Sequence, residues 1–408
     1  MRGLGVGVFV LVSALGSVTP GAFAACSQSN CTTGRQKSGA VYMKCLPEKS
    51  CWNGDMVVFA HGYVAPNQPI GVPTDQLTID GVSLPATFNQ FGYGFAASSY
   101  SKNGLAILQG ISDTQDLVQN VIRPTDNPRR VYLIGASEGG LVTTLSAEQL
   151  PQVYNAAGAA CGPIGSFQNQ INYLGDFRVV FDYFFPNLIP GSAVSIPQEV
   201  MTNWDSKYVP RITAALAANP AATAQLLKVT GAPVTTDPAT TPQTVLGILW
   251  YSVFATNDAT LTLGGQPFDN RNRLYFGSAN DILLNIFVER FSAAPAALSA
   301  VAAHYETTGK LMMPIITMHT TGDPIIPYWH EQAYTLKTLF AGTLLDRTDI
   351  PVAAYGHCAF NSAEVFLSFA LLVLRDFGQD ISSSISEALP EAQRSAFRSK
   401  AQYKGLRP

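Results

Sequence analysis

The residues from Val131 to Gly140 join a run of β-forming side chains to a Gly-x-Ser-x-Gly pentapeptide and then to a helical pattern. This order predicts a sharp turn between a buried strand and a helix, with Ser137 at its tip. Gly135 and Gly139 are needed because the neighbouring backbone approaches closely there. The alternative is a surface turn that happens to contain two glycines. The strand before the turn and the helix after it favour a nucleophilic serine.

Strands and helices alternate on both sides of this turn. Apolar runs predict strands at residues 41–43, 56–60, 93–100, 131–134, 156–161, 313–318 and 352–355. Helical spacing predicts helices at residues 84–91, 112–122, 138–150, 327–340 and 362–375. Such alternation is typical of an α/β fold, in which helices cover both faces of a mostly parallel sheet.

The alternation stops between residues 163 and 308, where aromatic clusters and Ala/Pro/Thr-rich pieces appear. This stretch is too long for a loop in a compact domain, so we expect a mainly helical cap insertion with its own packing. The expected core is therefore made of residues 25–162 and 309–408.

The N-terminal residues predict export. A basic start is followed by an apolar run at residues 6–15 and by Ala22-Phe23-Ala24, an A-x-A cleavage site, so residues 1–24 form a predicted signal peptide. A lipoprotein anchor on Cys26 is a minor alternative, which Phe23 fits poorly. No segment is long and apolar enough for a stable membrane span. We expect a secreted or periplasmic protein.

Six cysteines follow the predicted cleavage site, at positions 26, 31, 45, 51, 161 and 358. An even number in an exported chain favours disulfides, although fifteen pairings are formally possible. The short spacings favour Cys26–Cys31 and Cys45–Cys51, which leaves Cys161–Cys358. The cysteines form no C-x-x-C pair and have no histidine at ligand spacing, so no metal or cofactor is predicted. The net charge of −3 gives no basic surface for nucleic acid.

A serine nucleophile needs a base, and His357 is the best placed of five histidines. It follows the last predicted strand in a loop, and such loops commonly carry the chemistry of parallel sheets. If Cys358 pairs with Cys161, the bridge would hold His357 in place. The alternative is that this bridge contributes only to stability.

Asp323, in Thr-Gly-Asp-Pro after another predicted strand, is the candidate for orienting the base, although Asp and Gly beside Pro are also ordinary turn residues. The chain order Ser137, Asp323, His357 favours the catalytic role. Asp281 and Asp269 are weaker candidates, because neither follows a convincing strand.

An oxyanion formed at the substrate carbonyl requires backbone donors. The amide of Glu138, at the start of the helix, is one candidate. The amide of Tyr63, in the His-Gly-Tyr loop after the strand at 56–60, is the other. We expect His61 to have a structural role.

With GASEG, HGY, TGDP and GHC in place on these elements, the chain resembles the α/β-hydrolase superfamily. The resemblance implies an eight-stranded sheet, a Ser-Asp-His triad and a cap between the sixth and seventh strands. Within that superfamily the chain looks most like secreted bacterial esterases and lipases, and more remotely like prolyl-type serine peptidases. The acidic Glu138 beside the nucleophile is a departure that could repel anionic substrates or perturb His357.

Hydrolysis of a small-molecule or lipid-like carboxylic ester is thus the leading hypothesis. Aromatic side chains of the cap would line an apolar pocket, or else form only the core of the cap itself. A prolyl-type or aminopeptidase-like peptidase is the alternative, and it would need an acidic cluster such as Asp176, Asp182 and Glu289. A non-catalytic binding protein is a third possibility.

Overall fold

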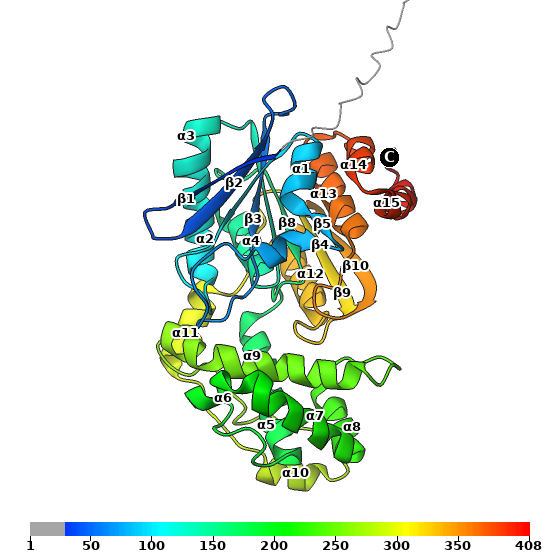
Figure 1. Cartoon of the computed structure of the whole chain (residues 1–408). Helices are drawn as coiled ribbons and strands as arrows, with labels where there is room; N and C mark the ends of the chain where they lie inside the picture. The colour runs from blue at the N-terminus through cyan, green and yellow to red at the C-terminus, as the bar shows by residue number, and fades with distance from the viewer. Residues whose placement is uncertain (1–28) are drawn as a thin grey trace, which may run out of the picture.

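The computed structural model describes residues 29–408 and has an eight-stranded sheet at its centre (Figure 1). The strand order is β1-β2-β6-β3-β7-β8-β9-β10. Strand β2 is antiparallel to both of its neighbours, β1 and β6, and all other neighbouring strands are parallel. The strands are β1 (Ser29–Arg35), β2 (Val41–Pro47), β3 (Asp55–Ala60), β6 (Gly94–Ser98), β7 (Arg130–Ala136), β8 (Ala156–Ala160), β9 (Ile315–Gly322) and β10 (Arg347–Tyr355). The predicted α/β fold with a mostly parallel sheet is confirmed.

Helices cover both faces of this sheet. The helices α2 (Ile107–Asp116) and α4 (Glu138–Gln149) pack on one face, and α1 (Leu84–Gln90) and α13 (Ser362–Phe377) pack on the other. Along β7, Leu133 faces the first group of helices, and Tyr132 and Ile134 face α1 and α13. Because both faces are buried, the parallel strands are apolar throughout instead of alternating.

The chain between β8 and β9 contains no strand of the main sheet. It forms a helical layer that lies beside the α/β part in Figure 1. Its helices are α5 (Phe167–Phe184), α6 (Gln198–Thr202), α7 (Val209–Ala218), α8 (Pro220–Thr230), α9 (Thr240–Thr262), α10 (Asp281–Phe287) and α11 (Pro295–His304). Most of its aromatic residues belong to one hydrophobic cluster of this layer or pack against it, and Phe181, Trp204 and Phe254 are buried there.

Several elements differ from the sequence predictions. The sequence does not predict strand β1, because its residues are polar and its position at the edge of the sheet leaves most of them exposed. The helix predicted at 112–122 begins earlier, at Ile107, and its last turn is a separate helical segment, η2 (Leu117–Ile122). Strand β10 begins at Arg347 rather than at residue 352. Two C-terminal helices, α14 (Ser382–Ala388) and α15 (Glu391–Tyr403), are additional to the predicted elements.

Two of the predicted disulfide pairings are wrong. Cys31 pairs with Cys45, because the antiparallel register of β1 and β2 places these residues directly opposite each other. Cys51 is also disulfide-bonded. The predicted Cys161–Cys358 bridge is confirmed and joins residues 197 positions apart. The predicted signal peptide and Cys26 lie outside the described residues. Between residues 29 and 408, no helix is long and apolar enough to cross a membrane.

Candidate functional site

Ser137 lies at the tip of the turn between β7 and α4, with φ 59° and ψ −122°. This is a backbone conformation that non-glycine residues rarely adopt, and it is held by the elements on either side. A Cβ atom at Gly139 would collide with the carbonyl oxygen of Ala60, and one at Gly135 would collide with the carbonyl oxygen of Gly139. The two glycines of the pentapeptide are therefore needed for close backbone approach.

The structure brings Ser137, His357 and Asp323 together from three separate loops. His357 Nε2 lies 2.8 Å from Ser137 Oγ, and His357 Nδ1 lies 2.7 Å from Asp323 Oδ2. With its proton on Nδ1, the imidazole donates to the carboxylate and accepts from the serine hydroxyl. This is the arrangement that proton removal from a serine requires.

The loop after β9 holds Asp323 in a fixed orientation. Asp323 is fully buried, and its Oδ1 accepts hydrogen bonds from the amides of Ile325 and Ile326 at 2.8 and 3.0 Å. Burial would raise the pKa of Asp323, but the charge of His357 and a hydrogen bond from His319 hold it well below its usual range. The carboxylate is therefore ionised at neutral pH, and its second oxygen, Oδ2, orients the imidazole of His357.

His319 on β9 is a site residue that the sequence analysis did not identify. Its ring is fully buried, with Nε2 2.7 Å from the carbonyl oxygen of Ile326 and 3.5 Å from Asp323 Oδ2, and Nδ1 3.2 Å from Glu331 Oε1. Burial would lower the pKa of His319, but hydrogen bonds to Asp323 and Glu331 raise it to about 10. Because both ring nitrogens face acceptors, this histidine is a buried cation behind Asp323.

Glu331 links this cation to a further charge. Its other carboxylate oxygen is paired with the guanidinium of Arg347, and both side chains are almost completely buried. Burial would raise the pKa of Glu331, but a hydrogen bond from His319 and the charges of His319 and Arg347 keep it low. Asp323 is therefore followed by a row of buried side chains with alternating charge: His319, Glu331 and Arg347.

The amides expected to bind an oxyanion lie beside Ser137. The amide of Gly62 donates to Gln76 Oε1 at 2.7 Å, so it is already occupied. A Cβ atom at Gly62 would lie 3.1 Å from Ser137 Cβ, which shows how closely this loop approaches the serine. The next amide in the loop is that of Tyr63, and the amide of Glu138 follows the serine directly. Both remain candidate donors.

The side chain of Glu138 is buried. Its Oε1 accepts a hydrogen bond from the amide of Ala106 at 2.8 Å. Burial raises the pKa of Glu138 to about 8, so this carboxyl holds its proton at neutral pH. We therefore expect neither repulsion of anionic substrates nor a charge acting on His357.

The Cys161–Cys358 bridge contacts the base directly. Cys358 Sγ lies 3.5 Å from His357 Nε2, and Cys161 follows β8, the strand beside the one that carries Ser137. Both cysteines have positive φ angles, 44° and 51°. Their sulfur atoms come close to His357 in an arrangement that could suit a metal, but the disulfide removes the thiolates that a metal would need.

The competing candidates lie elsewhere. Asp281, at the start of α10, accepts a hydrogen bond from the hydroxyl of Ser278, and Asp269 accepts one from the amide of Ala293. His61 is buried and stacks on Tyr100, with ring centroids 3.8 Å apart, and its Nδ1 bonds the carbonyl oxygen of Gly62. These contacts are structural.

A cavity of about 350 Å³ opens beside Ser137 and His357. Its lining is mostly apolar. It comes mainly from the sheet, from α1 and α13 and from Gln76, Thr78 and Ile79 before α1, and Tyr251 is the contribution of the helical layer. Burial raises the pKa of Tyr251, and a hydrogen bond with Ser137 opposes that shift. The expectation that aromatic residues of the insertion would line the pocket therefore holds for Tyr251, while most of the others fill the core of the layer.

Known proteins resemble this chain only in part. No protein-family model matches it, and no curated protein does. Among solved structures, feruloyl esterase B from Aspergillus oryzae is 15% identical with a TM-score of 0.44, over 82% of this chain and 73% of its own. The esterase LipA from Xanthomonas oryzae, a rice cell wall degrading enzyme, is 14% identical with a TM-score of 0.42, over 85% and 88%.

The uncomplexed acylaminoacyl peptidase of Pyrococcus horikoshii is 12% identical with a TM-score of 0.44. The match covers 88% of this chain but 44% of the peptidase, so this chain spans less than half of that protein. Likenesses this distant do not distinguish between ester and peptide substrates. The function must be argued from the residues of this chain.

Proposed function

We propose that this protein is an exported serine hydrolase that cleaves carboxylic esters through an acyl-enzyme on Ser137. One observation carries the proposal: an unbroken hydrogen-bonded chain from Asp323 through His357 to Ser137, at the mouth of an apolar cavity. A serine on a strained turn, a base and a buried ionised acid are the parts that acyl transfer needs.

In the proposed mechanism, Ser137 Oγ attacks the ester carbonyl while His357 Nε2 takes its proton. Asp323 holds the imidazole and stabilises the imidazolium that forms. The amides of Tyr63 and Glu138 bind the oxyanion, and the positive end of the α4 dipole supports them. His357 then protonates the leaving alcohol, and a water molecule activated in the same way releases the acid.

The contacts of Asp176 and Asp182, two of the three acidic residues in the cluster that a peptidase would need, favour an ester over a peptide substrate; the third, Glu289, is exposed. Asp176 is paired with Arg273 and accepts from the hydroxyl of Tyr275, and Asp182 accepts two hydrogen bonds from Arg178. A peptidase that binds a substrate amino terminus needs an unpaired carboxylate near its nucleophile. These carboxylates already have cationic partners within the helical layer.

The helical insertion, residues 163–308, is proposed to cap the site. Its α5 contacts the loop that carries Asp323, since Tyr173 donates to the carbonyl oxygen of Pro324 and Gln170 to that of Ile325. Its α9 contacts the loop after β3 that carries Tyr63, since the hydroxyl of Tyr63 donates to the carbonyl oxygen of Phe254. Secretion or a periplasmic location is supported by the disulfides Cys31–Cys45 and Cys161–Cys358.

The test is activity of the purified protein on p-nitrophenyl esters beside aminoacyl anilides, with labelling by a fluorophosphonate. We expect ester hydrolysis and labelling that are both lost in Ser137→Ala. Ester hydrolysis that survives in Ser137→Ala would remove the proposal. Preferential cleavage of the anilides would instead support the peptidase.

A further inference from the structure

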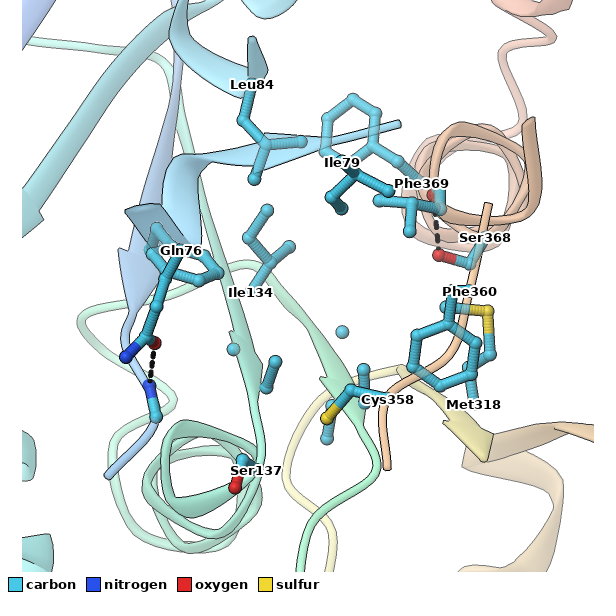
Figure 2. Close-up of a pocket in the computed structure, with 18 of the residues that line it drawn as sticks. Gln76, Ile79, Leu84, Ile134, Ser137, Met318, Cys358, Phe360, Ser368 and Phe369 are labelled. Carbon is cyan, nitrogen blue, oxygen red and sulfur yellow. Dashed lines mark hydrogen bonds between the residues drawn. The ribbon is translucent and has the colours of Figure 1, made fainter. Parts of the chain in front are cut away.

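We propose that the cavity beside Ser137 binds the acyl group of the substrate, and that it selects unbranched apolar acyl chains of about eight to ten carbons. The inference rests on the proposed function and adds the substrate class to it. It depends on the shape, depth and lining of the cavity, which extends from the nucleophile into the layer between the sheet and α13 (Figure 2).

Two rows of residues across the sheet form one wall of the cavity. Ala136, Ala160 and Met318 are paired in register on β7, β8 and β9, level with the serine turn. The next row on the same face is Phe59, Ile134, Gly158 and Ile316. Residues two apart on a strand are separated by about 7 Å, so the cavity extends at least that far below the nucleophile.

The space exists because β8 has no large side chains on this face. Gly158 and Ala160 lie at the centre of the wall, where a strand buried on both faces would normally carry Val, Ile or Leu. Ile134, Gly158 and Ala160 are each partly accessible to solvent although helices cover both faces of the sheet. Their accessible surface therefore faces the cavity.

The opposite wall comes from one face of α13, with Leu84 and Phe88 of α1 beside it. The lining residues of α13 are Val365, Ser368, Phe369 and Leu372, spaced at three or four residues. Ser368, the polar residue among these four, donates its hydroxyl to the carbonyl oxygen of Val365 at 2.7 Å, as Figure 2 shows. This wall therefore offers an apolar surface and suits a hydrocarbon chain.

The inner end of the cavity is lined by core residues. Phe88, Phe369 and Leu372 are at most 2% exposed, and the row of the sheet beneath, with Tyr132 and Ala156, is fully buried. A leaving alcohol needs a route to solvent after His357 protonates it, which an inner end closed by the core does not supply. The acyl group stays bonded to Ser137 until water releases it, so it is the part of the substrate that fits this space.

The volume sets the length of the chain. At roughly 30 Å³ for each water-sized group, a cavity of 350 Å³ holds about twelve such groups. Some of this space at the mouth is needed for the ester carbonyl. The remainder accommodates a chain of about eight to ten carbons.

The experiment measures kcat/KM for p-nitrophenyl esters from acetate to palmitate. For the unaltered protein we expect a rise of about two- to fourfold per methylene up to C8–C10, followed by a fall. Gly158→Val fills the second row, where a Cβ lies 3.3 Å from Ile134 and 3.8 Å from Leu372, and should lower the C8 to C4 ratio at least tenfold. Leu372→Ala deepens the inner end and should move the optimum to longer chains.

The control is Leu374→Ala, also a large-to-small change on α13 but outside the cavity lining, which should keep the profile of the unaltered protein. A second series, alkyl acetates of graded alcohol length, tests the other end of the substrate. A flat acyl profile, or a length dependence found only in the alkyl acetates, would overturn the inference while leaving the proposed function intact. Absence of hydrolysis and of fluorophosphonate labelling would count against the proposed function itself.

Discussion

The bridge between Cys161 and Cys358 should contribute both to stability and to catalysis, and the two effects can be separated. In the chain-entropy model, a disulfide stabilises the fold by restricting the unfolded chain, and the effect grows with the logarithm of the loop length. For residues 197 positions apart this amounts to about 5 kcal/mol at 25 °C, and for the 14 positions between Cys31 and Cys45 to about 3 kcal/mol. With the unfolding entropy of a chain this long, we expect Tm to fall by about 6 °C and about 4 °C respectively.

Only one of the two bridges touches the site. Cys358 is adjacent to His357 in the chain, and its sulfur lies 3.5 Å from the imidazole Nε2. Without the bridge, the loop after β10 loses its covalent link to the end of β8. A displacement of about 1 Å at reacting atoms can reduce the rate roughly 100-fold. We therefore expect Cys161→Ala/Cys358→Ala to lower kcat by about 10- to 100-fold in protein that remains folded.

The assay compares this double variant with Cys31→Ala/Cys45→Ala as the matched control. Both are measured well below their Tm values, for kcat on a p-nitrophenyl ester and for the rate of fluorophosphonate labelling. The control should lose stability and retain kcat, because β1 and β2 lie at the sheet edge, away from the serine turn. If the Cys161/Cys358 variant labels and turns over at the rate of the unaltered protein, the bridge contributes to stability alone and the reasoning about His357 is wrong.

Three further predictions concern buried carboxyl and imidazole groups. Asp323→Asn should lower kcat by roughly 10⁴-fold. The amides of Ile325 and Ile326 would hold the oxygen of the asparagine, so its NH2 group would face His357 Nδ1, favour the wrong tautomer and carry no charge to stabilise the imidazolium. Steady-state kinetics would check this, and a loss below tenfold would contradict it. The pKa of His319 is raised to about 10, so protonated His319 stabilises the fold fully below pH 6.5 and loses this contribution as the pH rises toward 10. The free energy of unfolding measured in urea should decline over that range, and His319→Gln should lack this decline. The pKa of Glu138 is raised to about 8, so the native protein keeps a proton that the unfolded chain loses above pH 4.5. The free energy of unfolding should therefore fall between pH 5 and 8. Glu138→Gln should reduce this pH dependence and leave the ester specificity unchanged.

The residues that the structure brings together at the proposed site were accessible from the sequence because each one follows a strand. Ser137, Asp323 and His357 come directly after β7, β9 and β10, and parallel strands place their carboxyl ends at one edge of a sheet. Chain order and strand position were therefore enough to group them. The Cys161–Cys358 pairing, by contrast, was predicted only as the pair left over from two short-range pairings that the structure contradicts.

The contacts of His319 with Asp323 and Glu331 could not be predicted in this way. His319 lies within a strand whose neighbours are apolar or Thr, and nothing in the sequence shows that its ring faces both Asp323 and Glu331. That contact depends on how the loop after β9 turns and on how α12 (Trp329–Ala341) packs against the sheet. The pairing of Cys31 with Cys45 likewise depended on a strand register that the polar sequence of β1 does not indicate.

The cavity could not be predicted from the sequence, because it exists where side chains are small. The aromatic clusters of the insertion are the visible apolar feature of the sequence, which leaves open whether they line the pocket or form only the core of the insertion. In the structure most of them stabilise the helical layer, and the space beside Ser137 results from Gly158 and Ala160 on β8. A glycine and an alanine in a strand carry no signal of a pocket until the facing helix is in place. If the acyl group does bind there, the small residues of the sheet determine the length of chain that reacts.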